Sequence, residues 1–215
     1  MGSIYVVGAN GERFDATGGP SFGYQDHGGH TAESTPAGHY TLGPKIHVST
    51  ASWPMSVIRW GAALRLNQSS EVEFSDDGRK WRLATGLLGE VTQAEIAYLN
   101  RDGKLHLVSK QRIVDHVRAI FVDPLSDKLR SPIWEKNDFG RWGWNMLAKG
   151  KGTGFYVHTT PADEAATAAA KAVFLTNSHG CIHLAPADRD LMIARGYLAP
   201  GVDLEVRSYG EKGPP

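Results

Sequence analysis

Short runs of alternating apolar and polar residues, separated by glycine-rich turns, are the feature that most constrains the fold of this chain. Asn10-Gly11 is typical of a tight β-hairpin turn, and Ser-Asp-Asp-Gly at residues 75–78 predicts a second hairpin. The 25 glycines and 11 prolines favour a turn-rich fold. We therefore predict a mainly β fold whose strands lie at residues 3–8, 12–16, 38–43, 62–67, 70–75, 80–85, 104–109, 118–123, 154–158 and 202–208. In the last run, Leu204 and Val206 should share a face.

A few short helices are expected among these strands. Residues 160–174 have a clear helix start, with Thr160 as N-cap, Pro161 at the first helical position, and Asp163 and Glu164 in the first turn. Further helices are predicted at residues 91–103 and 186–196.

One segment, residues 131–154, shows no clear periodicity of apolar residues. Residues 131–154 contain three tryptophans and many glycines, which predicts a long loop that either packs on the core through its aromatic residues or covers a cleft as a lid. We expect a single domain over residues 1–208, with an aromatic-rich insertion or lid at 86–153 and a disordered tail at 209–215.

Composition restricts the partners. Lys plus Arg and Asp plus Glu both number 23, so we expect no nucleic-acid partner. The sequence has no run of 18 apolar residues, so we expect no membrane-spanning helix. Residues 1–20 do not resemble a signal peptide. Work outside the cytoplasm would then require a removed leader or another export route. The sequence does not predict an oligomeric state.

Cys181 is the only cysteine, which excludes an intrachain disulfide. A catalytic cysteine reacts as thiolate and needs a base, for which His158, His179 and His183 are candidates. His179, Cys181 and His183 alternate and would line one surface of an extended segment. Gly180 would allow a tight turn whose backbone N–H groups could form an oxyanion hole. The alternative is a buried, inert cysteine with incidental histidines.

A zinc site is the main alternative chemistry. His27 and His30, in a His-Gly-Gly-His segment, together with His39 offer nitrogen ligands. The segment is a glycine-rich loop without a firm scaffold, so we expect histidines that stay solvated or help line the cleft, and neither a metal nor another cofactor.

Three separated elements resemble the L,D-transpeptidase family (the YkuD-type catalytic domain). Ser-His-Gly-Cys-Ile-His-Leu at 178–184 is similar to its signature, and Phe-Tyr-Val-His-Thr-Thr at 155–160 to the preceding histidine-bearing strand. Residues 34–43 resemble the family's Thr-Pro-x-Gly segment, and residues 181–206 resemble its closing helix and strand. The resemblance implies a YkuD-like β-sandwich or mixed sheet.

The resemblance also implies roles for individual residues. Cys181 would be the nucleophile, His158 its base, and the Thr159 carbonyl would orient the His158 ring. His179 and Gly180 would shape the nucleophile turn, with the N–H groups of Gly180 and Cys181 as oxyanion donors. Substrate-binding candidates are Ser178, His183 and Tyr156. The family usually has Arg or Asn at the position of His183, so carboxylate binding there would depend on pH.

The implied substrate is the peptidoglycan tetrapeptide stem, and the implied location is the cell envelope, the periplasm or outside the cell. The expected reaction is acyl transfer that cross-links stems or exchanges a D-amino acid, and carbapenem-type β-lactams would inhibit it. Alternatives are an L,D-carboxypeptidase-type thiol hydrolase, a secreted antibacterial cell-wall effector and a non-catalytic wall-binding module.

Overall fold

The chain forms two compact units. Unit 1 comprises residues 1–47 and 140–215, and unit 2 comprises residues 48–139. The computed structural model describes residues 4–20, 24–25, 31–48, 57–84, 118, 120–135, 139–175 and 178–211. Unit 2 begins and ends earlier than the insertion expected at residues 86–153. Strands between residues 63 and 83 belong to unit 2, and the strands at residues 143–148 and 151–158 belong to unit 1.

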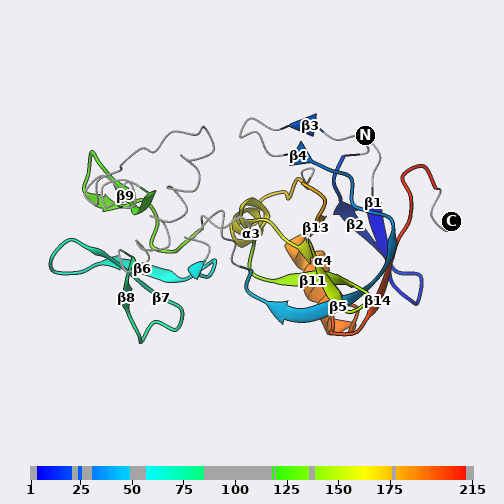
Figure 1. The fold of residues 1–215 in the computed structure, drawn as a ribbon. Coiled ribbons are helices and arrows are strands. Elements are labelled where there is room, and N and C mark those ends of the chain that lie inside the picture. Colours follow the sequence, from blue (N-terminus) through cyan, green and yellow to red (C-terminus); the bar gives the residue numbers. More distant parts are fainter. Residues whose placement is uncertain are drawn as a thin grey trace, which may run out of the picture. The chain divides into compact units, whose positions relative to one another are not determined.

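A seven-stranded mixed sheet organises unit 1 (Figure 1). Its strand order is β1-β2-β13-β12-β11-β5-β14, in which β12 and β13 are parallel and all other neighbours are antiparallel. The strands are β1 (Ile4–Val7), β2 (Arg13–Thr17), β5 (Gly38–Ile46), β11 (Gly143–Ala148), β12 (Lys151–His158), β13 (Ile182–Leu184) and β14 (Asp203–Val206). A separate pair is formed by β3 (Tyr24–Gln25) and β4 (Thr31–Ala32). The mainly β prediction is confirmed.

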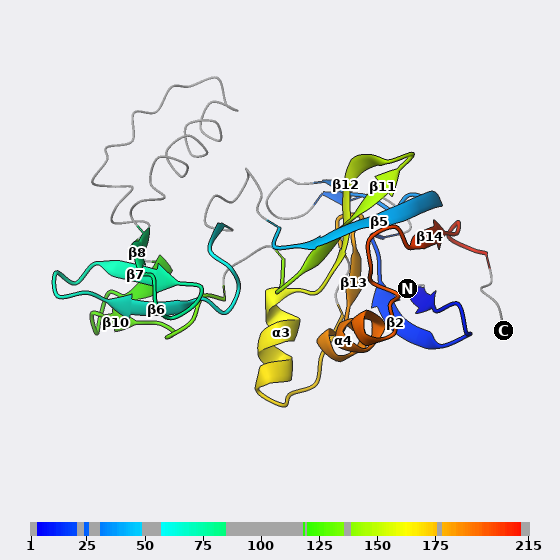
Figure 2. The same ribbon diagram turned by 90° about the horizontal axis from the view of Figure 1, so that it is seen from below.

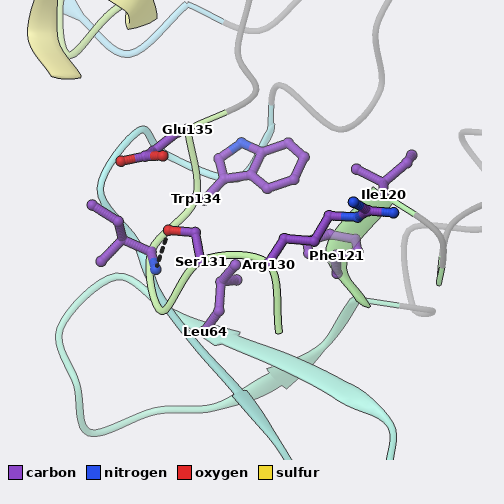
Figure 3. A pocket seen from close by; sticks show the side chains of 8 residues that line it. Leu64, Ile120, Phe121, Arg130, Ser131, Trp134 and Glu135 are labelled. Carbon is purple, nitrogen blue, oxygen red and sulfur yellow. Dashed lines mark hydrogen bonds between the residues drawn. The ribbon is translucent and has the colours of Figure 1, made fainter. Parts of the chain in front are cut away.

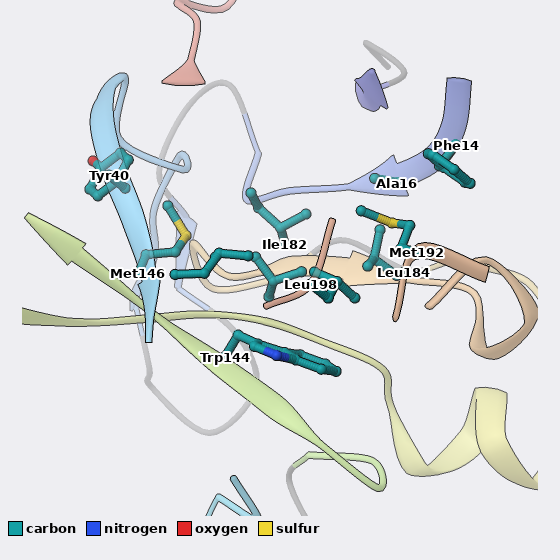
Figure 4. Packing of buried hydrophobic residues seen from close by; sticks show 11 residues of the cluster. Phe14, Ala16, Tyr40, Trp144, Met146, Ile182, Leu184, Met192 and Leu198 are labelled. Atoms are coloured by element: carbon teal, nitrogen blue, oxygen red, sulfur yellow. The ribbon is translucent and has the colours of Figure 1, made fainter. Parts of the chain in front are cut away.

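The core of unit 1 comes from one face of each central strand (Figure 4). Alternation places Trp144 and Met146 of β11 in this core, both fully buried, together with Ile182 and Leu184 of β13. The Asn10-Gly11 hairpin between β1 and β2 is confirmed, with Gly11 at φ 85°.

Two helices of unit 1 begin where the sequence predicts. Helix α3 (Pro161–Ala168) starts at Thr160, whose side chain accepts a hydrogen bond from the Asp163 N–H, but it ends well before residue 174. Helix α4 (Pro186–Ala194) begins at its proline. Both helices lie at the same end of the sheet (Figure 2).

Unit 2 has its own sheet and core. Strands β6 (Ala63–Leu66), β7 (Val72–Ser75) and β8 (Arg82–Leu83) form a three-stranded antiparallel sheet, and β9 (Val122–Asp123) pairs with β10 (Lys128–Leu129). Phe74, Phe121 and Trp134 fill its core. Figure 3 shows Leu64, Phe121 and Trp134 around a small cavity. Beside it, the Ile133 N–H donates to Ser131 Oγ at 3.2 Å.

Several expected elements differ from the structure. Within the loop expected at residues 131–154, residues 143–148 form β11 and β12 starts at residue 151, because Trp144 and Met146 alternate into the core. Of the strand expected at 118–123, Phe121 is helical and strand pairing starts at Val122. The helix expected at 91–103 and the strand expected at 104–109 lie outside the described residues. At the start of the tail, the Tyr209 hydroxyl donates to the Gly19 carbonyl at 2.5 Å.

Candidate active site

Two parallel strands bring the histidines of the candidate site together. Strands β12 and β13 pair with Val157 opposite Ile182 and His158 opposite His183. Since Val157 and Ile182 face the core, the two histidines lie on the other face. Their ring centroids are 4.6 Å apart in an edge-to-face arrangement at 69°, and both side chains are buried. The pairing therefore joins residues 25 positions apart in the chain.

The His158 ring is oriented by the next residue. Its Nδ1 lies 2.8 Å from the Thr159 carbonyl oxygen. Because a carbonyl can only accept, Nδ1 carries the hydrogen in this bond and the neutral ring keeps its lone pair on Nε2. Burial, reinforced by the neighbouring His183, lowers the pKa of His158 to about 3. His158 is therefore neutral at physiological pH, in the tautomer that can take up a proton at Nε2.

A tight turn precedes Cys181. Gly180 has φ 113°, a conformation that other residues rarely adopt, and a Cβ at this position would lie 2.4 Å from the Phe155 ring. Buried Ser178 closes the turn: its hydroxyl accepts the Gly180 N–H at 3.1 Å and donates to the Cys181 carbonyl at 2.5 Å. The Ser178 N–H donates to the Gly18 carbonyl at 3.0 Å. Three hydrogen bonds of Ser178 thus hold the turn from Ser178 to Cys181 together and attach it to residue 18.

The internal hydrogen bonds of this turn involve two groups for which the sequence predicts a role toward substrate. The Gly180 N–H, expected as an oxyanion donor, is bonded to Ser178, which leaves the Cys181 N–H as the candidate donor. The Ser178 hydroxyl, expected to contact substrate, is used within the turn.

The Cys181 thiol is half-buried at the start of β13. Burial raises its pKa to about 11, and a backbone hydrogen bond with Tyr156 opposes this shift. The site therefore holds a neutral thiol and a neutral imidazole, and a thiol in this state would need a base to remove its proton before it could act as a nucleophile.

The remaining predicted residues lie in different environments. Tyr156 is half-buried on β12, two positions before His158. His179 is exposed, so the positive φ of Gly180 interrupts the alternation that would have placed His179, Cys181 and His183 on one surface. His39 is exposed on β5, and His27 and His30 lie outside the described residues. In the part of the chain that the structure describes, no three His, Cys, Asp or Glu side chains are close enough to hold a metal ion.

Sequence reasoning missed a buried ion pair beside the site. Glu164 of α3 and Arg189 of α4 bond to each other and both contact the Thr159 hydroxyl. The sequence predicts Glu164 only as an acid in the first turn of a helix, and its pattern indicates no role for Arg189. The sequence does place an acid, Glu164, five residues after Thr159, within reach of a local contact. The contact with Arg189 depends on the packing of α3 against α4, which the sequence does not display.

The chain matches the family model of the L,D-transpeptidase catalytic domain, YkuD, over residues 4–192. Because the match spans most of its length, the chain belongs to this family, which confirms the resemblance in the sequence. Curated proteins and solved structures give no significant match.

Family membership supports an L,D-transpeptidase-type enzyme that acts on peptidoglycan, and thus work at the cell wall. Among the described residues, no helix is long and apolar enough to cross a membrane.

Proposed function

We propose that the protein is a cysteine acyltransferase that acts on peptidoglycan tetrapeptide stems, with Cys181 as nucleophile and His158 as base. The observation that carries the proposal is the orientation of His158. Its Nδ1–H is held by the Thr159 carbonyl, so Nε2 is the basic nitrogen, and the register of β12 with β13 pairs His158 with His183, two residues after Cys181.

The chemistry follows from two neutral groups. Cys181 Sγ attacks the carbonyl carbon of the L-to-D peptide bond while His158 Nε2 takes the thiol proton. The Cys181 N–H is the proposed donor to the oxygen on which negative charge develops. The C–N bond then breaks, the terminal D-residue leaves as an amine with the proton from His158, and a thioester remains on Cys181.

The thioester is resolved by a second nucleophile. An acceptor amine from another stem would give a cross-link, a free D-amino acid would give exchange, and water would give trimming. In each case His158 Nε2 accepts a proton from the attacking group and returns it to the departing Sγ. His183 and Tyr156 are proposed substrate contacts, and His183 also packs against the base.

Covalent trapping tests the nucleophile. Incubation with a carbapenem should give a single mass adduct, because Cys181 is the only cysteine and the β-lactam ring opens on the thiol. The variant Cys181→Ala should lose both the adduct and activity on stem peptides. A Cys181→Ala protein that kept full activity would rule out this mechanism.

Product analysis separates the outcomes. Purified disaccharide-tetrapeptide, incubated with the enzyme with and without a free D-amino acid, would be followed by mass spectrometry. Dimers indicate cross-linking, a mass change at the terminal residue indicates exchange, and tripeptide alone indicates a thiol hydrolase. We expect dimers or exchange products, and tripeptide alone would favour the carboxypeptidase alternative.

A further inference from the structure

Helices α3 and α4 are joined by a buried ion pair that the proposed chemistry does not use. Glu164 and Arg189 are 6% and 3% exposed, and Arg189 Nη1 bonds to Glu164 Oε1. Removing two charges from water is costly, and apolar side chains of similar size at such positions often give equal or greater stability. A contribution to stability is therefore a weak explanation for this ion pair. Its contacts with Thr159 indicate another role.

Glu164 holds the residue that follows the proposed base. The same Oε1 accepts the Thr159 hydroxyl at 2.6 Å and the Arg141 N–H at 3.0 Å. Arg189 Nη1 lies 3.4 Å from the Thr159 hydroxyl oxygen. Thr159 is fully buried, so its side chain is fixed between the two helices.

The main chain of Thr159 carries this restraint to His158. Its carbonyl accepts His158 Nδ1–H at 2.8 Å and the Gly140 N–H at 2.7 Å. Gly140 packs directly against Thr159: a Cβ on Gly140 would lie 2.2 Å from the Thr159 hydroxyl oxygen and 2.9 Å from its carbonyl oxygen. A carbonyl held in this way presents an acceptor to one ring nitrogen of His158, which favours the Nδ1–H tautomer.

We propose that Glu164 and Arg189 are positioning residues, which hold Thr159 so that its carbonyl keeps His158 in the tautomer and orientation with Nε2 as the base. The inference rests on the proposed function, in which Nε2 accepts the Cys181 proton. The two residues act through Thr159 and do not contact the reacting atoms.

Two variants remove the restraint without leaving a lone buried charge. Thr159→Val keeps the shape of the side chain and the ion pair but deletes the hydroxyl. The double variant Glu164→Leu/Arg189→Met replaces the pair by apolar side chains. The control is Asp190→Asn, because exposed Asp190 contacts Arg189 at 2.8 Å on the side away from Thr159.

Carbapenem acylation is measured by mass spectrometry against pH, at temperatures where circular dichroism shows every protein folded. We expect both test variants to acylate about 10- to 100-fold more slowly than wild type at pH 7, as for a misplaced general base. The deficit should shrink as pH rises toward the thiol pKa of about 11, because a thiolate no longer needs the base. Asp190→Asn should match wild type throughout.

A second measurement does not depend on activity. Imidazole ¹⁵N shifts of histidine-labelled protein, with His158 assigned by loss of its signals in His158→Gln, report the tautomer. Wild type should show the Nδ1–H form, and both test variants should show a mixture. Folded variants with the wild-type tautomer and an unchanged pH profile would overturn the inference. Altered tautomers together with an unreactive wild-type Cys181 would support the positioning and contradict the proposed function instead.

Discussion

At the scale of single residues, the candidate site consists of a neutral thiol and a neutral imidazole. This state arises from burial, which disfavours the charged form of both groups. Many cysteine nucleophiles rest as a thiolate–imidazolium pair, whereas in the mechanism proposed for this protein the proton would move as the thiol attacks. The proposed mechanism therefore requires that the His158 ring keep Nε2 available as the base.

The same burial predicts how stability depends on pH. The unfolded chain protonates His158 below about its ordinary pKa of 6.5, whereas the folded chain does so only near pH 3. The free energy of unfolding should therefore fall as pH decreases from 6.5 toward 3, with a contribution of about 1.4 kcal/mol per pH unit from this residue.

Cys181 gives the alkaline counterpart. The unfolded chain loses the thiol proton from about pH 9.0, but the folded chain keeps it until about pH 11, so stability is lost as pH rises between these values. Urea unfolding across the pH range checks both limbs. His158→Gln should flatten the acidic limb and Cys181→Ala the alkaline limb, and variants with wild-type slopes would contradict the assignments.

Gly180 predicts a large effect from a small change. Gly180→Ala adds strain at φ 113° and a clash with the Phe155 ring, so we expect about 2 kcal/mol or more of destabilisation and slower acylation. The control is Gly150→Ala, at φ 75° with no atom within 4 Å of the new Cβ, which should cost only about 1 kcal/mol. Thermal unfolding and the rate of carbapenem acylation compare the two. Equal losses at both sites would show that the turn tolerates a side chain at residue 180.

At the scale of elements, the starts of the two helices can be compared directly. Thr160 caps α3 by accepting the Asp163 N–H at 3.2 Å, whereas Ala185 begins α4 without a side-chain bond. Thr160→Ala should therefore destabilise the protein by about 1 kcal/mol, and Ala185→Ser should stabilise it by roughly 0.5–1 kcal/mol, since its extended backbone suits a cap. Urea unfolding at pH 7 measures both, and a loss of stability in Ala185→Ser would contradict the comparison.

The elements predicted best from the sequence depend on neighbouring residues. The Asn10-Gly11 hairpin, the Thr160 cap and the strand ending at His158 follow local rules that the sequence displays. The sequence does not predict strand β11, because the glycines and tryptophans in and around it resemble a loop and its partners β5 and β12 define it only in the folded sheet. The same difference holds within the candidate site. Cys181 and His158 can be predicted from sequence motifs, but the Glu164–Arg189 pair depends on the packing of α3 against α4.

At the scale of the whole molecule, unit 2 interrupts a pair of neighbouring strands. Unit 1 stops at residue 47 and resumes at residue 140, and β5 and β11, which flank this gap, are antiparallel with Ile46 opposite Gly143. Cα atoms of such a pair lie about 5 Å apart, so a short turn could join them. Unit 2 has a separate core around Phe74 and Trp134, and none of the described residues that form the core of unit 1 lies between residues 48 and 139.

Replacing residues 48–139 by a Gly-Ser-Gly-Ser linker should therefore leave unit 1 folded. Gly140 is retained because its N–H donates to the Thr159 carbonyl, and with it the orientation of His158 should survive. The shortened protein should unfold cooperatively in urea and form the carbapenem adduct at Cys181, with Cys181→Ala in the same background as control. If unit 2 serves substrate recognition, activity on disaccharide-tetrapeptide should fall while acylation by the small carbapenem persists. A shortened protein that is folded yet forms no adduct would show that unit 1 does not hold a complete catalytic site.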